Sequence, residues 1–239
     1  VNNALAIAGT LITRGGTILN GAVTTAVGSL VRIQGDSTVG TASLTVNQAW
    51  TNLGTVELTS VGNVQAAQLF GAAMTNAVGA TLAVLPGTGG VRDINTGIQN
   101  QGTVTIAQPV AFAPGAGVVT NVGTWTLEAN QAMTFSGGGF SSSGTLNVNA
   151  GRTLSITNGS FNWQGGNFSG GGTVSFSGTA VTFAVDFTQV QQVTLVVASS
   201  TVGGAGIITV PVGQTLTLTS STVNNALAIA GTLITRGGT

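Results

Sequence analysis

The sequence contains no cysteine, histidine, lysine or tyrosine, and only 4% of its 239 residues are charged. Without cysteine no disulfide framework forms, and without cysteine and histidine the usual ligands of zinc are missing. The five basic and five acidic residues balance, so no charged surface favours nucleic acid or an anionic membrane. No apolar run reaches the roughly 18 residues of a transmembrane helix. We therefore expect no cofactor, no nucleic-acid partner and no membrane insertion.

The residues that are abundant suit strands and tight turns. Glycine occurs 38 times, apolar residues make up 42% of the chain, and the polar remainder is mostly Thr, Ser, Asn and Gln. This apolar content, regularly spaced, buries enough surface to offset the entropy of ordering the chain. Composition thus favours a folded all-β protein without disulfides.

A long exact repeat links the two ends of the chain. Residues 1–17 recur without change as residues 223–239, an offset of 222 residues. Either the natural protein is built from near-identical 222-residue units, or one end of this chain is a copy of the other. We expect the first, since no capping segment or start methionine is present. Residues 1–222 then form one unit, and 223–239 begin the next.

A shorter motif of glycine, Thr or Ser, and then alternating apolar and polar residues recurs within the unit. Its spacing gives about ten coils of roughly 22 residues in each 222-residue unit. Such coils bury their apolar side only by stacking, which predicts a parallel β-solenoid over residues 1–239 as one continuous domain. At about 4.8 Å per coil, one unit would be about 48 Å long. The clear copies begin at Gly54, Gly79, Gly102, Gly123, Gly144 and Gly172, and the looser copies at Gly9, Gly28, Gly206 and Gly231.

Alternation within the motif identifies the residues expected to point inward. A period of two is typical of strands with one buried side. The intervening residues should point outward, and we expect the irregular segments 61–78, 86–99 and 184–205 to carry loops. The predicted core residues are Val56, Leu58, Val104, Ile106, Trp125, Leu127, Leu146, Val148, Val174 and Phe176.

Asparagines at a constant distance from the strands predict a side-chain ladder. Most precede the motif glycine by two residues, one is displaced by a single place, and a serine takes the last position. At one corner of successive coils such amides stack and bond along the axis, although Asn is also simply common in turns. The expected ladder consists of Asn52, Asn76, Asn100, Asn121 and Ser142.

The phrases NVGTWTLEAN, SSGTLNVNAGRTLSITNGSF and GGGTVSFSG resemble repeats of filamentous-haemagglutinin-type exoproteins, autotransporter passengers and related giant bacterial surface proteins. The resemblance covers most of the chain and lies in the style of the repeat. It implies a right-handed β-helix, secretion to the cell surface, and a role in adhesion, matrix or filament formation. Together with the long exact repeat and the low charge, it leads us to expect a structural repeat of an extracellular fibre whose main partner is itself.

Three other functions are weighed against this one. An adhesin stalk would bind glycan or a host surface through its loops, and Trp163 is a possible surface aromatic for sugar stacking. An ice-binding solenoid needs a sustained array of Thr, whereas the expected outward column is mixed. A polysaccharide enzyme needs clustered carboxylates, and Asp36, Glu57 and the other acids are widely spaced. The adjacent Arg92 and Asp93 are interpreted as a loop ion pair. We expect no enzyme.

Overall fold

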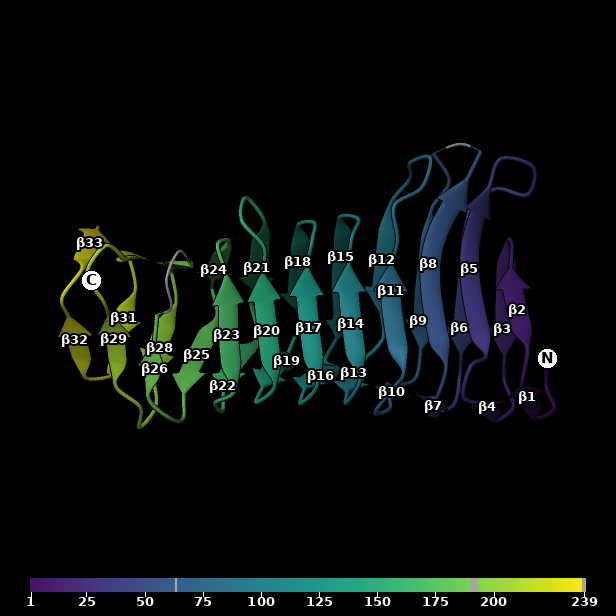
Figure 1. Cartoon of the computed structure of the whole chain (residues 1–239), viewed down its shortest axis with the longest axis horizontal. Helices are drawn as coiled ribbons and strands as arrows, with labels where there is room; N and C mark the ends of the chain where they lie inside the picture. Colours follow the sequence, from purple (N-terminus) through teal and green to yellow (C-terminus); the bar gives the residue numbers. More distant parts are fainter. Residues whose placement is uncertain (63, 190–192, 238–239) are drawn as a thin grey trace.

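The computed structural model describes residues 1–62, 64–189 and 193–237, and it is a parallel β-solenoid of eleven coils. Each coil contributes three strands, and every pair of neighbouring strands is parallel. The described residues contain no helix. The coils follow one another along the long axis, with the two termini at opposite ends (Figure 1). The predicted fold class is confirmed, with about eleven coils in the whole chain.

Sheet A, the first side of the solenoid, runs the whole length of the rod. It takes one strand from every coil, and each strand pairs with its counterparts one coil before and one coil after. Its members are β1 (Leu5–Ile7), β4 (Val23–Thr25), β7 (Trp50–Asn52), β10 (Met74–Asn76), β13 (Ile98–Asn100), β16 (Val118–Asn121), β19 (Gly139–Ser142), β22 (Ser160–Trp163), β25 (Ala180–Phe183), β28 (Thr201–Gly203) and β31 (Thr222–Val223).

The second side is divided into two sheets. Sheet B covers the first eight coils, and the three-stranded sheet D takes the same position between sheets A and C in the last three. Sheet B comprises β2 (Thr10–Thr13), β5 (Leu30–Asp36), β8 (Thr55–Val61), β11 (Thr81–Val84), β14 (Thr103–Ile106), β17 (Thr124–Leu127), β20 (Thr145–Val148) and β23 (Asn167–Gly170). Sheet D comprises β26 (Phe187–Thr188), β29 (Ile208–Val210) and β32 (Leu227–Ile229).

Sheet C, the third side, is again continuous over all eleven coils. Its strands are β3 (Gly16–Leu19), β6 (Ala42–Val46), β9 (Ala67–Gly71), β12 (Arg92–Asn95), β15 (Val110–Gly115), β18 (Gln131–Phe135), β21 (Thr153–Thr157), β24 (Thr173–Ser177), β27 (Thr194–Ala198), β30 (Thr215–Thr219) and β33 (Thr232–Arg236).

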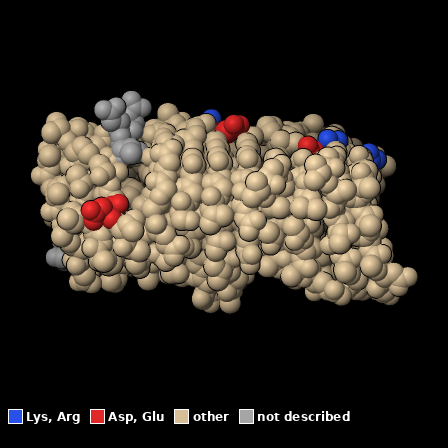
Figure 2. All heavy atoms as spheres, turned by 60° about the horizontal axis from the view of Figure 1, so that its bottom comes forward, with Lys and Arg blue, Asp and Glu red and all other residues tan. Residues whose placement is uncertain are grey.

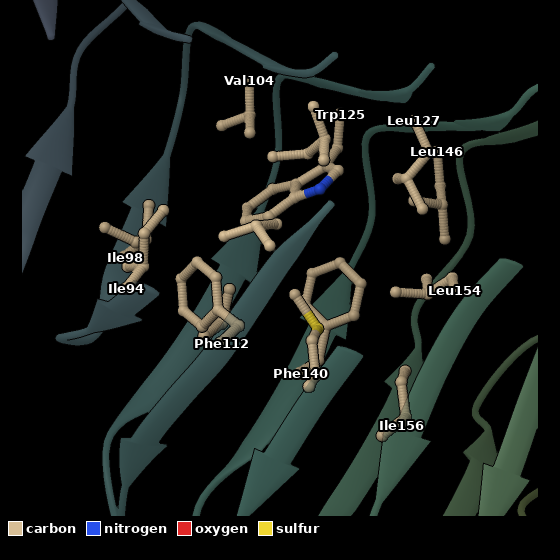
Figure 3. Close-up of a cluster of buried hydrophobic side chains, with 14 of the residues drawn as sticks. Ile94, Ile98, Val104, Phe112, Trp125, Leu127, Phe140, Leu146, Leu154 and Ile156 are labelled. Atoms are coloured by element: carbon tan, nitrogen blue, oxygen red, sulfur yellow. The ribbon is translucent and has the colours of Figure 1, made fainter. Parts of the chain in front are cut away.

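The core is one column of apolar side chains enclosed by the three sides. All ten predicted core residues are buried, as the alternation predicted. Aromatic rings occupy the centre of the middle coils, where Trp125 lies 5.5 Å from Phe140 and 6.0 Å from Phe112 between ring centroids (Figure 3). Inside the core, the Trp125 indole N–H donates to Oε1 of Gln131 at 2.9 Å. Burying these rings supplies much of the hydrophobic stabilisation.

The motif does not stay on one side of the solenoid. Its copies from Gly54 to Gly144 precede strands of sheet B, but the copy at Gly172 precedes β24 of sheet C. Val174 and Phe176 are therefore buried on sheet C and do not extend the sheet B column, which β23 continues instead. Alternation predicts which side chains point inward, and it was correct here, but it carries no information about the side of the solenoid on which a strand lies.

The motif glycine is required by the close approach of successive coils. A Cβ atom on Gly144 would lie 2.2 Å from the carbonyl oxygen of Gly123, and one on Gly123 would lie 2.2 Å from that of Gly102. Contacts this short are forbidden, so a larger residue at Gly123 or Gly144 would force these coils apart at the corner that precedes sheet B. In the coils where the preceding turn differs, Ser29 and Ala80 take the equivalent position, so the glycine is required only where the shorter turn brings the coils this close.

One corner projects from the rod. We call it the crest: residues 34–41, 59–62, 64–66 and 85–91, at the corner between sheets B and C in coils two to four. Strands β5 and β8 have seven residues each, and they rise above their neighbours (Figure 1). The expectation of loops is correct for only part of each segment, because 61–78, 86–99 and 184–205 contain whole strands of sheets A, C and D and the last residue of β8 in sheet B. Residue 63 of the first segment and residues 190–192 of the last lie outside the described residues.

The two identical 17-residue segments occupy different sides of the solenoid. The first copy places its strands β1 and β2 in sheets A and B. The equivalent residues of the second copy form β32 and β33, in sheets D and C. The same sequence is therefore displaced by one side between the two ends of the rod.

Candidate functional site

The predicted asparagine ladder forms at the corner between sheets A and B. Nδ2 of Asn52 donates to Oδ1 of Asn76 at 2.9 Å, and Asn76 repeats this to Asn100 at 2.8 Å. Asn100 donates to Oδ1 of Asn121 at 2.8 Å, and Asn121 ends the series at Oγ of Ser142 at 3.2 Å. All five residues are buried. They are also in register across the paired strands, including Asn76, whose sequence offset differed.

Each amide also ties sheet A to sheet B. Nδ2 of Asn76 donates to the carbonyl of Thr103 at 3.0 Å, and Nδ2 of Asn100 donates to that of Thr124 at 3.0 Å. Asn52 bonds in the same way to Thr81, at 3.1 Å. Buried polar groups stabilise a fold only when they are hydrogen-bonded, and these amides are bonded both along the axis and across the corner. The ladder therefore fixes the direction in which the chain enters sheet B.

Trp163 is not a surface aromatic. Its side chain is 3% exposed and lies in register above Ser142, at the position that the ladder would occupy in the next coil. Its ring packs edge-on against Phe168 at 5.7 Å and Phe187 at 5.8 Å, and Phe183 follows it in the next coil. The prediction of a possible surface aromatic was wrong, because the register of sheet A directs the indole into the core.

A second ladder, made of hydroxyl groups, was not predicted. At the corner between sheets C and A, the Thr179 N–H donates to Oγ of Ser200 at 3.0 Å, and the Ser200 N–H donates to Oγ of Ser221 at 3.3 Å. The two serine hydroxyls donate to carbonyls two residues earlier, at Ala198 and Thr219. The constant spacing of 21 residues between the three positions was the signal that could have revealed it.

The surface carries few charges, and most of those visible in Figure 2 lie along one edge. Two ion pairs link neighbouring coils: Arg32 to Glu57 at 2.7 Å and Arg14 to Asp36 at 3.7 Å. The Thr38 N–H donates to Asp36 at 2.7 Å, and this bond, with help from Arg14, holds the pKa of the Asp36 carboxyl below its usual value. These groups brace the base of the crest.

The expected ion pair between Arg92 and Asp93 does not form. Adjacent residues of a strand point to opposite sides, so Asp93 faces outward, where it accepts a bond from Gln68 at 2.7 Å. The buried Arg92 faces inward and donates to the carbonyls of Gly89 at 2.9 Å and Gly90 at 3.1 Å and to the hydroxyl of Ser60 at 3.0 Å. Burial lowers the pKa of its guanidinium. Arg92 thus holds the connector 85–91 of the crest in place.

A hollow on the surface of sheet C lies beside the crest. It has a volume of about 420 Å³, and its floor is made by small outward residues such as Ala111, Ala132 and Ser155. Asp93 and Asn130 border it. The hollow is open, and no aromatic ring lines it, so it offers polar groups at its edges but no stacking platform for a sugar.

Other features of a site are few. Within the described ranges, no three acidic, histidine or cysteine side chains come together in a group that could hold a metal ion. The described residues also include no helix long and apolar enough to cross a membrane. The outward column of sheet B holds Glu57, Ala83, Thr105, Thr126 and Asn147, and it is mixed in composition; Ser175, which follows the motif glycine Gly172, lies on sheet C.

Comparison with known proteins finds no matching family model, curated protein or solved structure.

Proposed function

We propose that the chain is a structural segment of a secreted, fibre-forming surface protein whose units stack end to end into one rod. The observation that carries this proposal is the exact repeat. Residues 1–17 and 223–239 are identical, and both copies form part of the solenoid, at opposite ends of the coil stack. A stretch that forms the first coil of one unit and the last coil of another allows the core to continue across the junction.

The outer strands of this sequence suit continuation of the coil stack. Strands β1–β3 and β31–β33 each pair with one neighbouring coil of this sequence and present their other edge to a further coil. Such edges favour pairing with a further strand, either the next unit of the same chain or another molecule. The near absence of charge removes the repulsion that would oppose this association or the bundling of rods.

Electron cryomicroscopy of the 239-residue chain, and of a chain carrying two units in tandem, tests the proposal. We expect filaments with an unbroken core and a layer line near ~4.8 Å. Monodisperse rods of about 50 Å at every concentration, together with two hinged rods in the tandem chain, would overturn it. Labelling of unpermeabilised source cells with an antibody against the crest tests the extracellular location, since intact cells should bind it.

The hollow on sheet C favours a second function, an adhesin stalk that binds glycan. Its polar border, which includes Asp93 and Asn130, offers hydrogen bonds to sugar hydroxyls. Filling the hollow by Ala132→Trp should abolish glycan-array binding while leaving rods intact. A matched substitution outside the hollow, Thr105→Trp on sheet B, should leave binding unchanged. An array with no bound glycan for the unmodified chain would exclude this function.

A further inference from the structure

The displaced copy of the 17-residue segment has a consequence for how units follow one another. From Leu5 in sheet A to Leu227 in sheet D the chain completes ten coils and then advances by one more side. The repeat of 222 residues is therefore not a whole number of coils. A unit that followed directly would begin on a different side from its predecessor.

The core accepts the segment on either pair of sides. In the first copy Leu5 and Ile7 lie in register with Val23 and Thr25, which are buried. In the second copy Leu227 and Ile229 lie in register with Ile208 and Val210, which are also buried. The same residues of the segment thus point inward at both ends, because a change of side keeps the two-residue alternation.

The remainder of the segment behaves in the same way. Leu11 stacks on the buried Val31 of sheet B, whereas its counterpart Leu233 stacks on the buried Leu216 of sheet C. Nothing in the alternation of this sequence restricts it to one side.

Local hydrogen bonds hold each copy where it lies. In the first copy, Asn2 accepts a bond from Nδ2 of Asn20 at 2.6 Å, which connects it to the chain entering the second coil. In the second copy, Nδ2 of Asn225 donates to the carbonyls of Gly204 at 3.2 Å and Gly206 at 2.8 Å, in the coil before it. The corner between sheets A and D therefore supplies two acceptors for the Nδ2 group of Asn225.

We infer that consecutive 222-residue units of the rod are rotated by one side, a third of a turn, so that the pattern returns after three units and about 31 coils. This inference rests on the proposed function, in which units follow one another in one rod. The residues equivalent to sheet A, B and C strands of one unit then lie on sheets B, C and A of the next.

The rotation determines where the crest appears. In the first unit the crest projects from the corner between sheets B and C, in the next from the corner between C and A, and in the third from the corner between A and B. A rod built in this way presents its projection on three sides in turn, at intervals of about 50 Å along the axis. Lateral contacts made through the crest would join each rod to neighbours in three directions.

Cysteine cross-linking tests the two placements, since the native chain has no cysteine to interfere. Thr209 and Ala228 are direct neighbours on paired strands, as are Ala6 and Thr24. Neighbouring parallel strands lie at a separation that a disulfide spans. We expect T209C/A228C and A6C/T24C to form disulfides.

Each control pair would be neighbours on paired strands only if its copy of the segment lay on the sides that the other copy occupies. For the second copy this pair is G203C/A228C, and for the first it is A6C/R32C. Efficient oxidation of a control pair in place of its partner pair would overturn the inference.

Imaging of the tandem two-unit chain completes the test. A gold label on Ser37→Cys in the crest, introduced in both units, marks the direction in which each crest points. After subtraction of the coil-to-coil twist measured on a single unit, we expect the labels a third of a turn apart on one continuous rod. Labels on the same side would overturn the rotation and leave the proposed function standing. Two rods joined by a hinge would overturn the proposed function itself.

Discussion

The corner between sheets A and B is built in two chemically different ways along the rod. In coils three to seven the ladder residues from Asn52 to Ser142 bond along the axis, whereas in coils eight and nine the same column holds Trp163 and Phe183. Sheet B is continuous where the amides connect it to sheet A, and it ends at β23, in the first coil after the ladder. The difference teaches that the hydrogen-bonded corner links sheet A to sheet B directly, while the aromatic corner fills space without such links.

Removal of Trp163 is expected to have the largest effect. Trp163→Ala would leave a cavity between Phe168 and Phe187 and should lower the free energy of unfolding by about 4 kcal/mol. Chemical denaturation followed by tryptophan fluorescence and circular dichroism measures the loss. Val122→Ala, at an exposed position, is the control and should change little. Equal effects of the two variants would contradict the view that packing supports the aromatic corner.

Interruption of the ladder should come next. Asn100→Ala removes the acceptor for Asn76 and the donor to Asn121 and Thr124, all in the buried corner, which should cost about 3 kcal/mol. Hydrogen exchange should increase at the amides of β14 and β17 before it increases in sheet C. The neighbouring Gln99→Ala removes an exposed side chain and serves as the control. Uniform loss of protection along the rod would show that the ladder does not act on sheet B in particular.

The last position of the ladder should matter less. Ser142→Ala deletes the acceptor for Asn121, but Nδ2 of Asn121 keeps its bond to the Thr145 carbonyl at 2.9 Å. A loss of about 1 kcal/mol is expected, because a single hydrogen bond is removed and its donor stays partnered. Denaturant midpoints compared with those of Asn100→Ala measure the difference. A loss as large as that of Asn100→Ala would mean that the end of the ladder is as critical as its middle.

The smallest expected effect is the loss of stability of the crest in acid, which the ladder and the aromatic part of the corner between sheets A and B should not share. The pKa of Asp36 is lowered in the folded chain, so its carboxylate contributes stability above the usual value of 3.8, and this contribution is lost as pH falls through the lowered pKa. The ladder residues do not ionise and should not respond. Thermal melts between pH 5 and pH 2 should show a decline for the native chain that is smaller in Asp36→Asn. Identical profiles would remove Asp36 as the acid-sensitive group.

The sequence was sufficient for the features that depend on local periodicity. Alternation predicted the inward position of Val56 and Leu58, and a fixed offset predicted the ladder. The displacement of Asn76 arises from two extra residues in the turn before β11, where the Ala80 N–H bonds to the Ala77 carbonyl at 2.9 Å. The turn absorbs the insertion, and the ladder keeps its register.

Features that depend on which side a strand occupies could not be predicted in this way. Val174 is buried as predicted, but alternation could not assign it to sheet C, because the same alternation serves sheets A, B, C and D equally. The 17-residue segment makes this plain, since one sequence lies in two places within one chain. Only the cumulative length of strands and turns assigns the side, and small insertions shift it.

The buried amides all point the same way: each Nδ2 from Asn52 to Asn121 donates towards the carboxyl-terminal end of the rod. Unlike backbone hydrogen bonds between parallel strands, whose directions alternate, these side-chain dipoles add. The ladder thus carries a dipole along the axis, with an acceptor oxygen leading at its amino-terminal end and a donor group at its carboxyl-terminal end. In the fibre proposed above, two rods meeting with like ends would oppose these dipoles, so the ladder would favour stacking of rods in one direction.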